Sequence, residues 1–312
     1  MSAPASDARA WHTATADPAM WRRQLPPHLI AYLEQTIGEL RDRPHPLLGL
    51  WAEEGLSASH HGDLQDALDV LEQGCGFVVL EGLPVERWSV EEATAVYWEL
   101  GRLLGEPVTQ NVQGTLLYDV RDTGQDVRYG ARFSVTNAES SFHTDNSFGS
   151  VMVDYVGLLC LKTARRGGLS QIVSGHAVRE CLRRAAPDAL QTLALPFHVD
   201  RRGGVQPGEA PTIRFPVMHG EGDALECRYL RYWIEAGHEK ASEPLTPEQV
   251  RALDALDAVL ADPSLRAEFD LRPGDMLFVN NRWIFHNRTA FDDHLELERK
   301  RHLVRLWLRR RS

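Results

Sequence analysis

The feature that most constrains the fold is a series of short apolar segments that fills the chain after residue 105. The segments VDYVGLLCLKT, CRYLRYWI, DMLFVN and LVRLWL are examples, and Gly, Pro and Asp residues separate them. Apolar runs of this length between turn residues are typical of β-strands. Two helix patterns interrupt the strands, one at about 177–193 and one that runs from the capping box Thr246–Gln249 to Leu260. Since no repeat or low-complexity linker divides the series, we expect one β-rich domain.

The preceding part of the chain has mainly helical patterns. Apolar residues recur at helical spacing from 27 to 40 and from 64 to 71, and Ser89 with Glu92 forms a capping box for a helix that reaches Leu103. The segment 76–85 has the pattern of a buried strand. Residues 1–20 show no periodicity, so they are expected to form a flexible tail. The predicted organisation is therefore a tail (1–20) and a single domain (21–312), with a helical flank that includes the first strand (21–105) and a β-rich core with helical insertions (106–312).

Composition narrows the class of partner. The chain has 34 Lys and Arg residues against 44 Asp and Glu residues, a net charge of −10, which argues against a nucleic-acid-binding surface. Its 4 cysteines are too few and too widely spaced for a disulfide framework. No apolar run approaches the roughly 20 residues of a membrane span. We expect a cytoplasmic protein with a small-molecule partner and with no nucleic-acid or membrane partner, and a homo-oligomer is compatible with these features.

The nucleophile and phosphate-binding motifs GxSxG, GxxxxGK[ST] and GxGxxG are all absent from the sequence. The candidates that remain are histidine and carboxylate side chains. A His-x-Asp or His-x-Glu triplet in an extended segment places both side chains on one face, where they can share a metal. Such triplets occur at 61–63, 143–145, 198–200 and 219–221. Three of them lie in polar turns or loops, whereas His143 and Asp145 lie between Phe142 and Phe148. The sequence therefore favours His143 and Asp145 as metal ligands.

A third ligand would complete the set of two histidines and one carboxylate that leaves open positions on Fe(II). The two late candidates are His294, in the acidic turn DDHLE, and His286, which lies in NNRWIFHNRTAF among aromatic residues. A metal pocket that excludes water needs apolar surroundings with polar insets. His286 is therefore the predicted third ligand.

At this point the sequence resembles a known family. GGLS at 167–170, GDMLFVNNRWIFHNRTAFDD at 274–293 and RHLVRLWL at 301–308 are similar to segments of the Fe(II)/2-oxoglutarate-dependent oxygenases, in the branch of taurine dioxygenase and clavaminate synthase. The resemblance covers about residues 76–308. It implies a mainly β (α+β) fold with flanking helices, built on a double-stranded β-helix, or jelly roll.

The resemblance also implies a set of roles. His143, Asp145 and His286 would hold Fe(II), while Ser170 and Arg301 would bind the distal carboxylate of 2-oxoglutarate. The implied reaction uses O2 to oxidise an unactivated C–H bond of a small molecule and releases succinate and CO2. Hydroxylation is the expected outcome, with desaturation or cyclisation as alternatives. Because the gap from His286 to the arginine is slightly long, Arg299 is an alternative to Arg301.

The terminal strand supports Arg301 on physical grounds. Period-two alternation places Arg301, Leu303, Arg305 and Trp307 on one face of residues 301–308. Arginine is suited to bidentate binding of a carboxylate in a partly buried site, so a dicarboxylate is a fitting partner for this face. The alternative is a solvated strand edge, on which the apolar side chains pack sideways.

Two questions stay open at the level of sequence. His, Asp and His would also serve a non-redox metal-binding protein, either a zinc hydrolase or a metabolite sensor, although such a protein would not need Arg301 and Ser170. The substrate is not determined either. The polar, Gly-rich segments 108–135 and 199–212 are expected to form lids. The candidate substrate-binding residues are Asn111, Asp119, Arg132 and Arg305.

Overall fold

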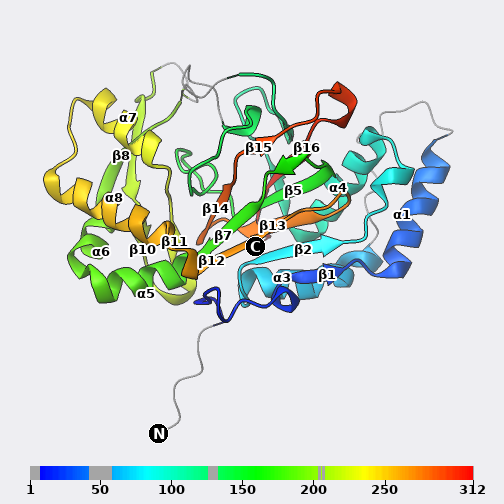
Figure 1. Ribbon diagram of the computed structural model, residues 1–312, viewed down its shortest axis with the longest axis horizontal. Helices are drawn as coiled ribbons and strands as arrows, with labels where there is room; N and C mark the ends of the chain where they lie inside the picture. Colours follow the sequence, from blue (N-terminus) through cyan, green and yellow to red (C-terminus); the bar gives the residue numbers. More distant parts are fainter. Residues whose placement is uncertain (1–7, 42–57, 126–132, 203–204, 206–207, 312) are drawn as a thin grey trace, which may run out of the picture.

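The centre of the fold is a large sheet that crosses the middle of Figure 1. A computed structural model of the chain describes residues 8–41, 58–125, 133–202, 205 and 208–311. In spatial order the sheet contains β1 (Arg22–Gln24), β2 (Phe77–Glu81), β13 (Met276–Asn280), β5 (Tyr155–Lys162), β16 (His302–Arg309) and β3 (Glu106–Val108), and β4 (Leu117–Val120) also pairs with β16. Strands β1 and β2 are parallel, and the other described pairs in this sheet are antiparallel.

A smaller antiparallel sheet faces the large one. Its strands, in spatial order, are β12 (Arg266–Phe269), β7 (Ser170–Ser174) and β14 (Ile284–Arg288). Side chains from β5, β13 and β16 of the large sheet and from β7 and β14 of the small sheet line one cavity. Two sheets that enclose a common site form a double-stranded β-helix, which is the predicted fold class.

Three two-stranded sheets complete the β-structure of the described residues. They pair β8 (Pro196–Asp200) with β9 (Thr212–Pro216), β10 (Met218–His219) with β11 (Glu226–Cys227), and β6 (Arg166–Gly167) with β15 (Phe291–Asp292).

Helices flank the sheets on two sides. The α-helices are α1 (Pro27–Leu40), α3 (Gln65–Glu72), α4 (Val90–Leu104), α5 (Gly175–Ala185), α6 (Pro187–Leu193), α7 (Arg231–Ala241) and α8 (Pro247–Leu260). The 3-10 helices are η1 (Pro18–Met20), η2 (Ala58–Leu64), η3 (Val85–Arg87), η5 (Phe133–Val135), η6 (Gly222–Ala224), η7 (Pro263–Leu265) and η8 (Leu297–Arg299). Figure 1 shows α5 to α8 on one side of the sheets and α1 and α4 on the other. No helix among the described residues is long and apolar enough to cross a membrane.

Two of the helix starts are those that the capping boxes predict. At α4 the Ser89 side chain accepts from the Glu92 backbone N–H, and the Glu92 side chain accepts from the Ser89 backbone N–H. Thr246 and Gln249 make the same reciprocal pair at α8. These bonds satisfy N–H groups that have no partner within the helix.

Two sequence predictions about local structure are wrong. The helix expected at 177–193 is two helices, because Pro187 ends α5 and begins α6. The segment CRYLRYWI, expected to be a strand, contributes only Cys227 to β11 and then enters α7. Ile234, Gly237 and His238 are the buried residues of α7, so helical periodicity outweighs the strand preference of the aromatic run.

The expected flexible tail is also wrong for residues 8–20. The Trp11 side chain is 3% exposed, and its indole N–H donates to the Cys75 carbonyl at 2.8 Å. The Thr13 hydroxyl donates to the carbonyls of Pro263 and Arg266. A single tryptophan can bury a large apolar area, so this polar segment packs against the core despite its composition. Residues 1–7 lie outside the described residues.

The strand β16 separates the core from the cavity. A Cβ added at Gly101 of α4 would lie 2.2 Å from Leu306, so the outward face of β16 packs closely against the helix. Arg301, Leu303, Arg305 and Trp307 line the cavity on the opposite face. The predicted alternation of this segment is therefore present in the structure.

Candidate metal centre and the cavity around it

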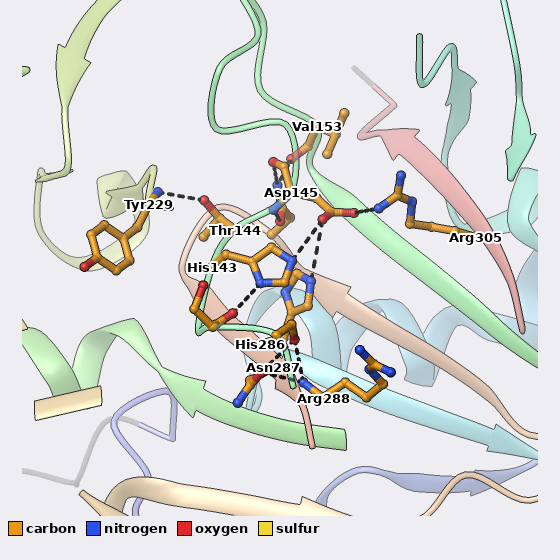
Figure 2. Close-up of polar contacts among 12 residues, drawn as sticks. His143, Thr144, Asp145, Val153, Tyr229, His286, Asn287, Arg288 and Arg305 are labelled. Carbon is orange, nitrogen blue, oxygen red and sulfur yellow. Dashed lines mark hydrogen bonds and ion pairs between the residues drawn. The ribbon is translucent and has the colours of Figure 1, made fainter. Parts of the chain in front are cut away.

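Two imidazoles and one carboxylate meet at one end of the cavity. The Asp145 Oδ1 atom lies 3.4 Å from His143 Nε2 and 3.7 Å from His286 Nε2. Figure 2 shows the three side chains pointing toward one another. Ligand atoms bound at adjacent positions of one metal ion lie about 3 Å apart, so a small contraction would bring these donors to binding distance.

The backbone holds the two histidines together. His143 and His286 form an isolated antiparallel bridge, in which the His143 N–H donates to the His286 carbonyl at 3.1 Å and the His286 N–H donates to the His143 carbonyl at 3.0 Å. On its other edge, β14 pairs His286 with Ile172 and Arg288 with Ser170. Because pairing on both edges fixes β14, His143 and His286 present their rings to the same point, although they lie 143 positions apart in the sequence.

Each imidazole presents Nε2 to this point. His143 Nδ1 lies 2.8 Å from the Ser141 carbonyl oxygen, which accepts a hydrogen bond only if Nδ1 carries the proton. His286 Nδ1 is buried without a hydrogen-bond partner among the described residues. Burial, followed by the nearby His143, lowers the pKa of the His286 imidazole. A neutral imidazole is the form that binds a metal.

Asp145 is fixed by four contacts. Its backbone N–H donates to Asn281 Oδ1 at 2.7 Å, and Asn281 Nδ2 donates to the Asp145 carbonyl at 2.9 Å. Carboxylate Oδ2 accepts from the Trp307 indole N–H at 2.7 Å and from Arg305 Nη1 at 3.1 Å. Since Oδ2 is held in this way, Oδ1 is the oxygen that faces the histidines.

The charge state of Asp145 follows from these neighbours. Burial favours the neutral carboxyl, but the charge of Arg305 and the contacts with His143 and His286 hold the pKa of Asp145 well below its usual range. The ionised carboxylate is the form that binds a metal ion. Two neutral imidazole nitrogens and one carboxylate oxygen are the donor set of the facial triad of non-haem Fe(II) enzymes, so these residues fit Fe(II).

Arg301 is a buried cation on the cavity wall. Its residue is 6% exposed, and its guanidinium carbon lies 5.1 Å from the centre of the Phe291 ring. Among the described residues, no carboxylate lies within ion-pair distance of this guanidinium, and burial lowers its pKa. The nearest opposite charge is that of Asp293, which accepts from the Arg301 backbone N–H and not from the guanidinium. A buried guanidinium without a direct ion pair is unfavourable, so the site is suited to an anionic ligand. Ser170 is also buried and lines the same cavity.

Arg299, the alternative to Arg301, lies elsewhere. It ends η8, its side chain is 61% exposed, and its nearest carboxylate is Glu296 at 3.9 Å. It is not among the residues that line the cavity.

The four candidate substrate-binding residues have different positions. Arg305 lines the cavity, where its Nε donates to Gln110 Oε1 at 2.8 Å. Asn111 and Asp119 are not among the described residues that line the cavity. The Asn111 side chain bonds within its own loop, to Gln113 and Thr115, and the Asp119 carboxylate binds His302 of β16 at 2.7 Å. Arg132 lies outside the described residues. Of the expected lids, the described parts contribute Gln110, Val120, Phe133, Ser134 and Arg202 to the cavity wall.

Residues of the other triplets have partners of their own among the described residues, away from the cavity. His198 binds Glu243 at 3.1 Å, Asp200 binds Lys240 at 2.7 Å, and Glu221 binds Arg179. In the first triplet, Asp63 contacts His60 and His28.

Sequence reasoning missed several residues of the site. Asn281, Gln110 and Arg288 were not singled out, although Arg288 lines the cavity and donates to the carbonyls of Thr136 and Ala138. Trp307 was placed on the correct face without a role. The available signal was the alternation of β16, which puts the indole on the same side as Arg301 and Arg305.

We predict that Trp307→Phe weakens Fe(II) binding about 10- to 100-fold, because residues that orient a metal ligand contribute on this scale. The ring and its packing are kept, whereas the indole N–H that holds Asp145 Oδ2 is lost. The measurement is an anaerobic Fe(II) titration. Trp98→Phe is the matched control, since the Trp98 indole N–H is buried without a partner among the described residues. Equal affinities for the two variants would contradict the role of Trp307.

A jelly roll with this donor set and a buried arginine on the cavity wall defines the class of non-haem Fe(II) enzymes that use a carboxylate co-substrate. Residues 43–307 match the family described as taurine catabolism dioxygenase TauD, TfdA family. The chain belongs to this family.

Individual relatives agree with this assignment. The chain is 30% identical over 246 residues to FR-33289 synthase from Streptomyces rubellomurinus, which covers 77% of this chain and 71% of the relative. It is also 30% identical over 254 residues to a uridine-5'-phosphate dioxygenase from a Streptomyces species, which covers 77% and 87% of the two chains.

Solved structures share the fold. An asparagine oxygenase in complex with Fe(II), 2S,3S-3-hydroxyasparagine and succinate superposes with a TM-score of 0.70 at 21% identity, over 92% of this chain and 93% of the other. The non-heme iron oxygenase OrfP, in complex with Fe and alpha-ketoglutaric acid, gives 0.66 at 18% identity, over 92% and 94%. The predicted fold and enzyme class are confirmed: the chain is an Fe(II)/2-oxoglutarate-dependent dioxygenase that acts on a small molecule. The alternative of a non-redox metal protein is set aside.

Proposed function

We propose that His143, Asp145 and His286 hold Fe(II), and that Arg301 and Ser170 bind the distal carboxylate of 2-oxoglutarate. One observation carries the proposal: a convergent set of two imidazoles and one carboxylate shares a cavity with a buried guanidinium that lacks a carboxylate partner in the described part of the chain. When bound, Fe(II) with 2-oxoglutarate and O2 supplies the oxidising power for attack on an unactivated C–H bond.

The residues of this chain position the reactants. Ionised Asp145, held on Oδ2 by Trp307 and Arg305, would offer only Oδ1 to the metal. Arg301 orients a dicarboxylate by pairing with the carboxylate that is remote from the metal. Apolar side chains on both sheets, including Val156, Ile172 and Leu303, limit the access of water to the reacting carbon.

We further propose that the substrate carries an acidic group that binds near Arg305. The cavity of about 440 Å³ has the size of a small-molecule site. Three arginines (Arg288, Arg301, Arg305) and one carboxylate (Asp145) are among the described residues that line it. A bound divalent metal would add further positive charge, and one dicarboxylate would neutralise only part of the total. The remaining positive charge favours an anionic substrate. One relative is named for uridine-5'-phosphate, an anionic compound, and an anionic substrate would agree with the positive charge of this cavity.

The test is a screen of purified enzyme for substrate-dependent succinate release, with small acids and the matching neutral amides or esters. We expect turnover of an acid and at least tenfold lower kcat/KM for its neutral analogue. Arg305→Leu should raise the KM for the acid at least tenfold. Arg309→Ala, which removes an exposed arginine of the same strand, should leave it unchanged. Equal use of acid and neutral analogue by the unmodified enzyme would contradict an anionic substrate.

A further inference from the structure

A second group of metal-binding side chains lies outside the cavity, between α1 and η2. It contains His28, near the start of α1, with His60 and Asp63 of η2. The Asp63 Oδ1 atom lies 3.0 Å from His28 Nε2, and Oδ2 lies 2.8 Å from His60 Nδ1. The three ligand atoms all lie within 4.8 Å of one another.

The geometry of this group is close to that of a metal site. Donors bound to one tetrahedral ion at about 2.0–2.1 Å lie roughly 3.3 Å apart. The two imidazole nitrogens contact different oxygens of Asp63, so a rotation of the carboxylate would bring one oxygen to both nitrogens. The His60 ring is held in place by Tyr32, whose ring centre lies 4.5 Å away. The side chains of His60 and Asp63 are 13% and 17% exposed, whereas that of His28 is 64% exposed. An ion could therefore enter from solvent beside His28, and water would complete its coordination.

Simple hydrogen bonding also accounts for the short contacts, because Asp63 can accept one N–H from each imidazole. The two possibilities differ in what happens when a metal is added. An imidazole nitrogen that donates a proton to Asp63 can lose it to the solvent and bind the metal through the freed lone pair. Two imidazoles and a carboxylate are a donor set that suits Zn(II) and neighbouring late divalent ions.

We propose that His28, His60 and Asp63 form a peripheral site for a divalent transition ion of the Zn(II) class. The ion would join α1 to η2 and would stabilise the folded chain by the free energy of its binding. This site is independent of the function proposed for the cavity, since it uses none of the residues assigned there.

The experiment uses the full chain without a histidine tag, freed of metal, with the catalytic ligands removed by the double substitution His143→Ala and His286→Ala. Calorimetric titration with Zn(II) should give one ion per chain, and Zn(II) should raise the Tm of unfolding. Adding His28→Ala should weaken binding at least tenfold and remove the Tm increase. Adding His219→Ala, an exposed histidine that belongs to neither group, should change neither result.

Failure of Zn(II) to bind the double variant, or unchanged affinity after His28→Ala, would overturn the proposal. If the double variant does not fold, the stoichiometry of Zn(II) on the unmodified chain replaces it. Two ions per chain, falling to one in His28→Ala, would support the site. One ion in both proteins would refute it. Neither result bears on turnover with Fe(II), so this proposal and the assignment of the cavity fail separately.

Discussion

His286→Ala is expected to abolish Fe(II)-dependent turnover while the fold stays intact. The substitution removes one of three donors, and no other histidine or carboxylate among the described residues reaches the same point. The lost ring leaves no broken hydrogen bond at Nδ1, because that atom is buried without a partner in the described structure. The change in the free energy of unfolding should therefore be limited to lost packing. Succinate release measures turnover, an anaerobic titration measures Fe(II) affinity, and thermal unfolding measures stability.

The control for this prediction is His219→Ala, which replaces an exposed histidine of another His-x-Glu triplet. It should keep full activity and full Fe(II) affinity. Loss of activity in His219→Ala together with normal activity in His286→Ala would show that the metal centre has been assigned to the wrong residues.

Arg301→Ala is expected to raise the KM for 2-oxoglutarate by roughly 30-fold or more. Breaking a buried charged pair and leaving one partner unpaired typically costs about 2–5 kcal/mol, and each 1.4 kcal/mol is about a factor of ten in affinity. The free energy of unfolding of the ligand-free enzyme should fall by less than the free energy of 2-oxoglutarate binding. The reason is that the Arg301 guanidinium has no ion pair with a carboxylate in the described structure. Kinetics at varied 2-oxoglutarate and thermal unfolding without ligand together test both statements.

Arg299→Ala is the matched control, since it removes an exposed arginine two residues earlier. Its KM for 2-oxoglutarate should equal that of the unmodified enzyme. Arg301→Lys should restore part of the affinity, because lysine keeps the charge but not the two parallel donors. A large effect at Arg299 with none at Arg301 would contradict the assigned register of β16.

The sequence was sufficient to select residues whose positions depend on local periodicity. His143 and Asp145 share a face because their segment is extended, and Arg301, Arg305 and Trp307 share one because β16 alternates with period two. The helix starts at Ser89 and Thr246 were predictable for a similar reason, since a capping box is complete within four residues.

Contacts between distant segments were not predictable in this way. The hydrogen bond from Trp307 to Asp145 joins residues 162 positions apart, and the two bonds between Asn281 and Asp145 join residues 136 apart. Their existence depends on how the strands pair, which a single sequence does not encode locally. For the same reason, the burial of Trp11 was missed, and so were the contacts of Asp63 with His60 and His28.

The reciprocal backbone bonds between His143 and His286 have a consequence for the exchange of the metal. They make the two imidazoles a chelating unit that is assembled when the chain folds, so the entropy of gathering two ligands is lost before any ion arrives. Rotation of one side chain can release one donor, but the other stays in place and allows the first to rebind. Full release of the ion then requires both imidazoles to let go before either one rebinds, so the shared backbone anchor is expected to lengthen the lifetime of the bound ion.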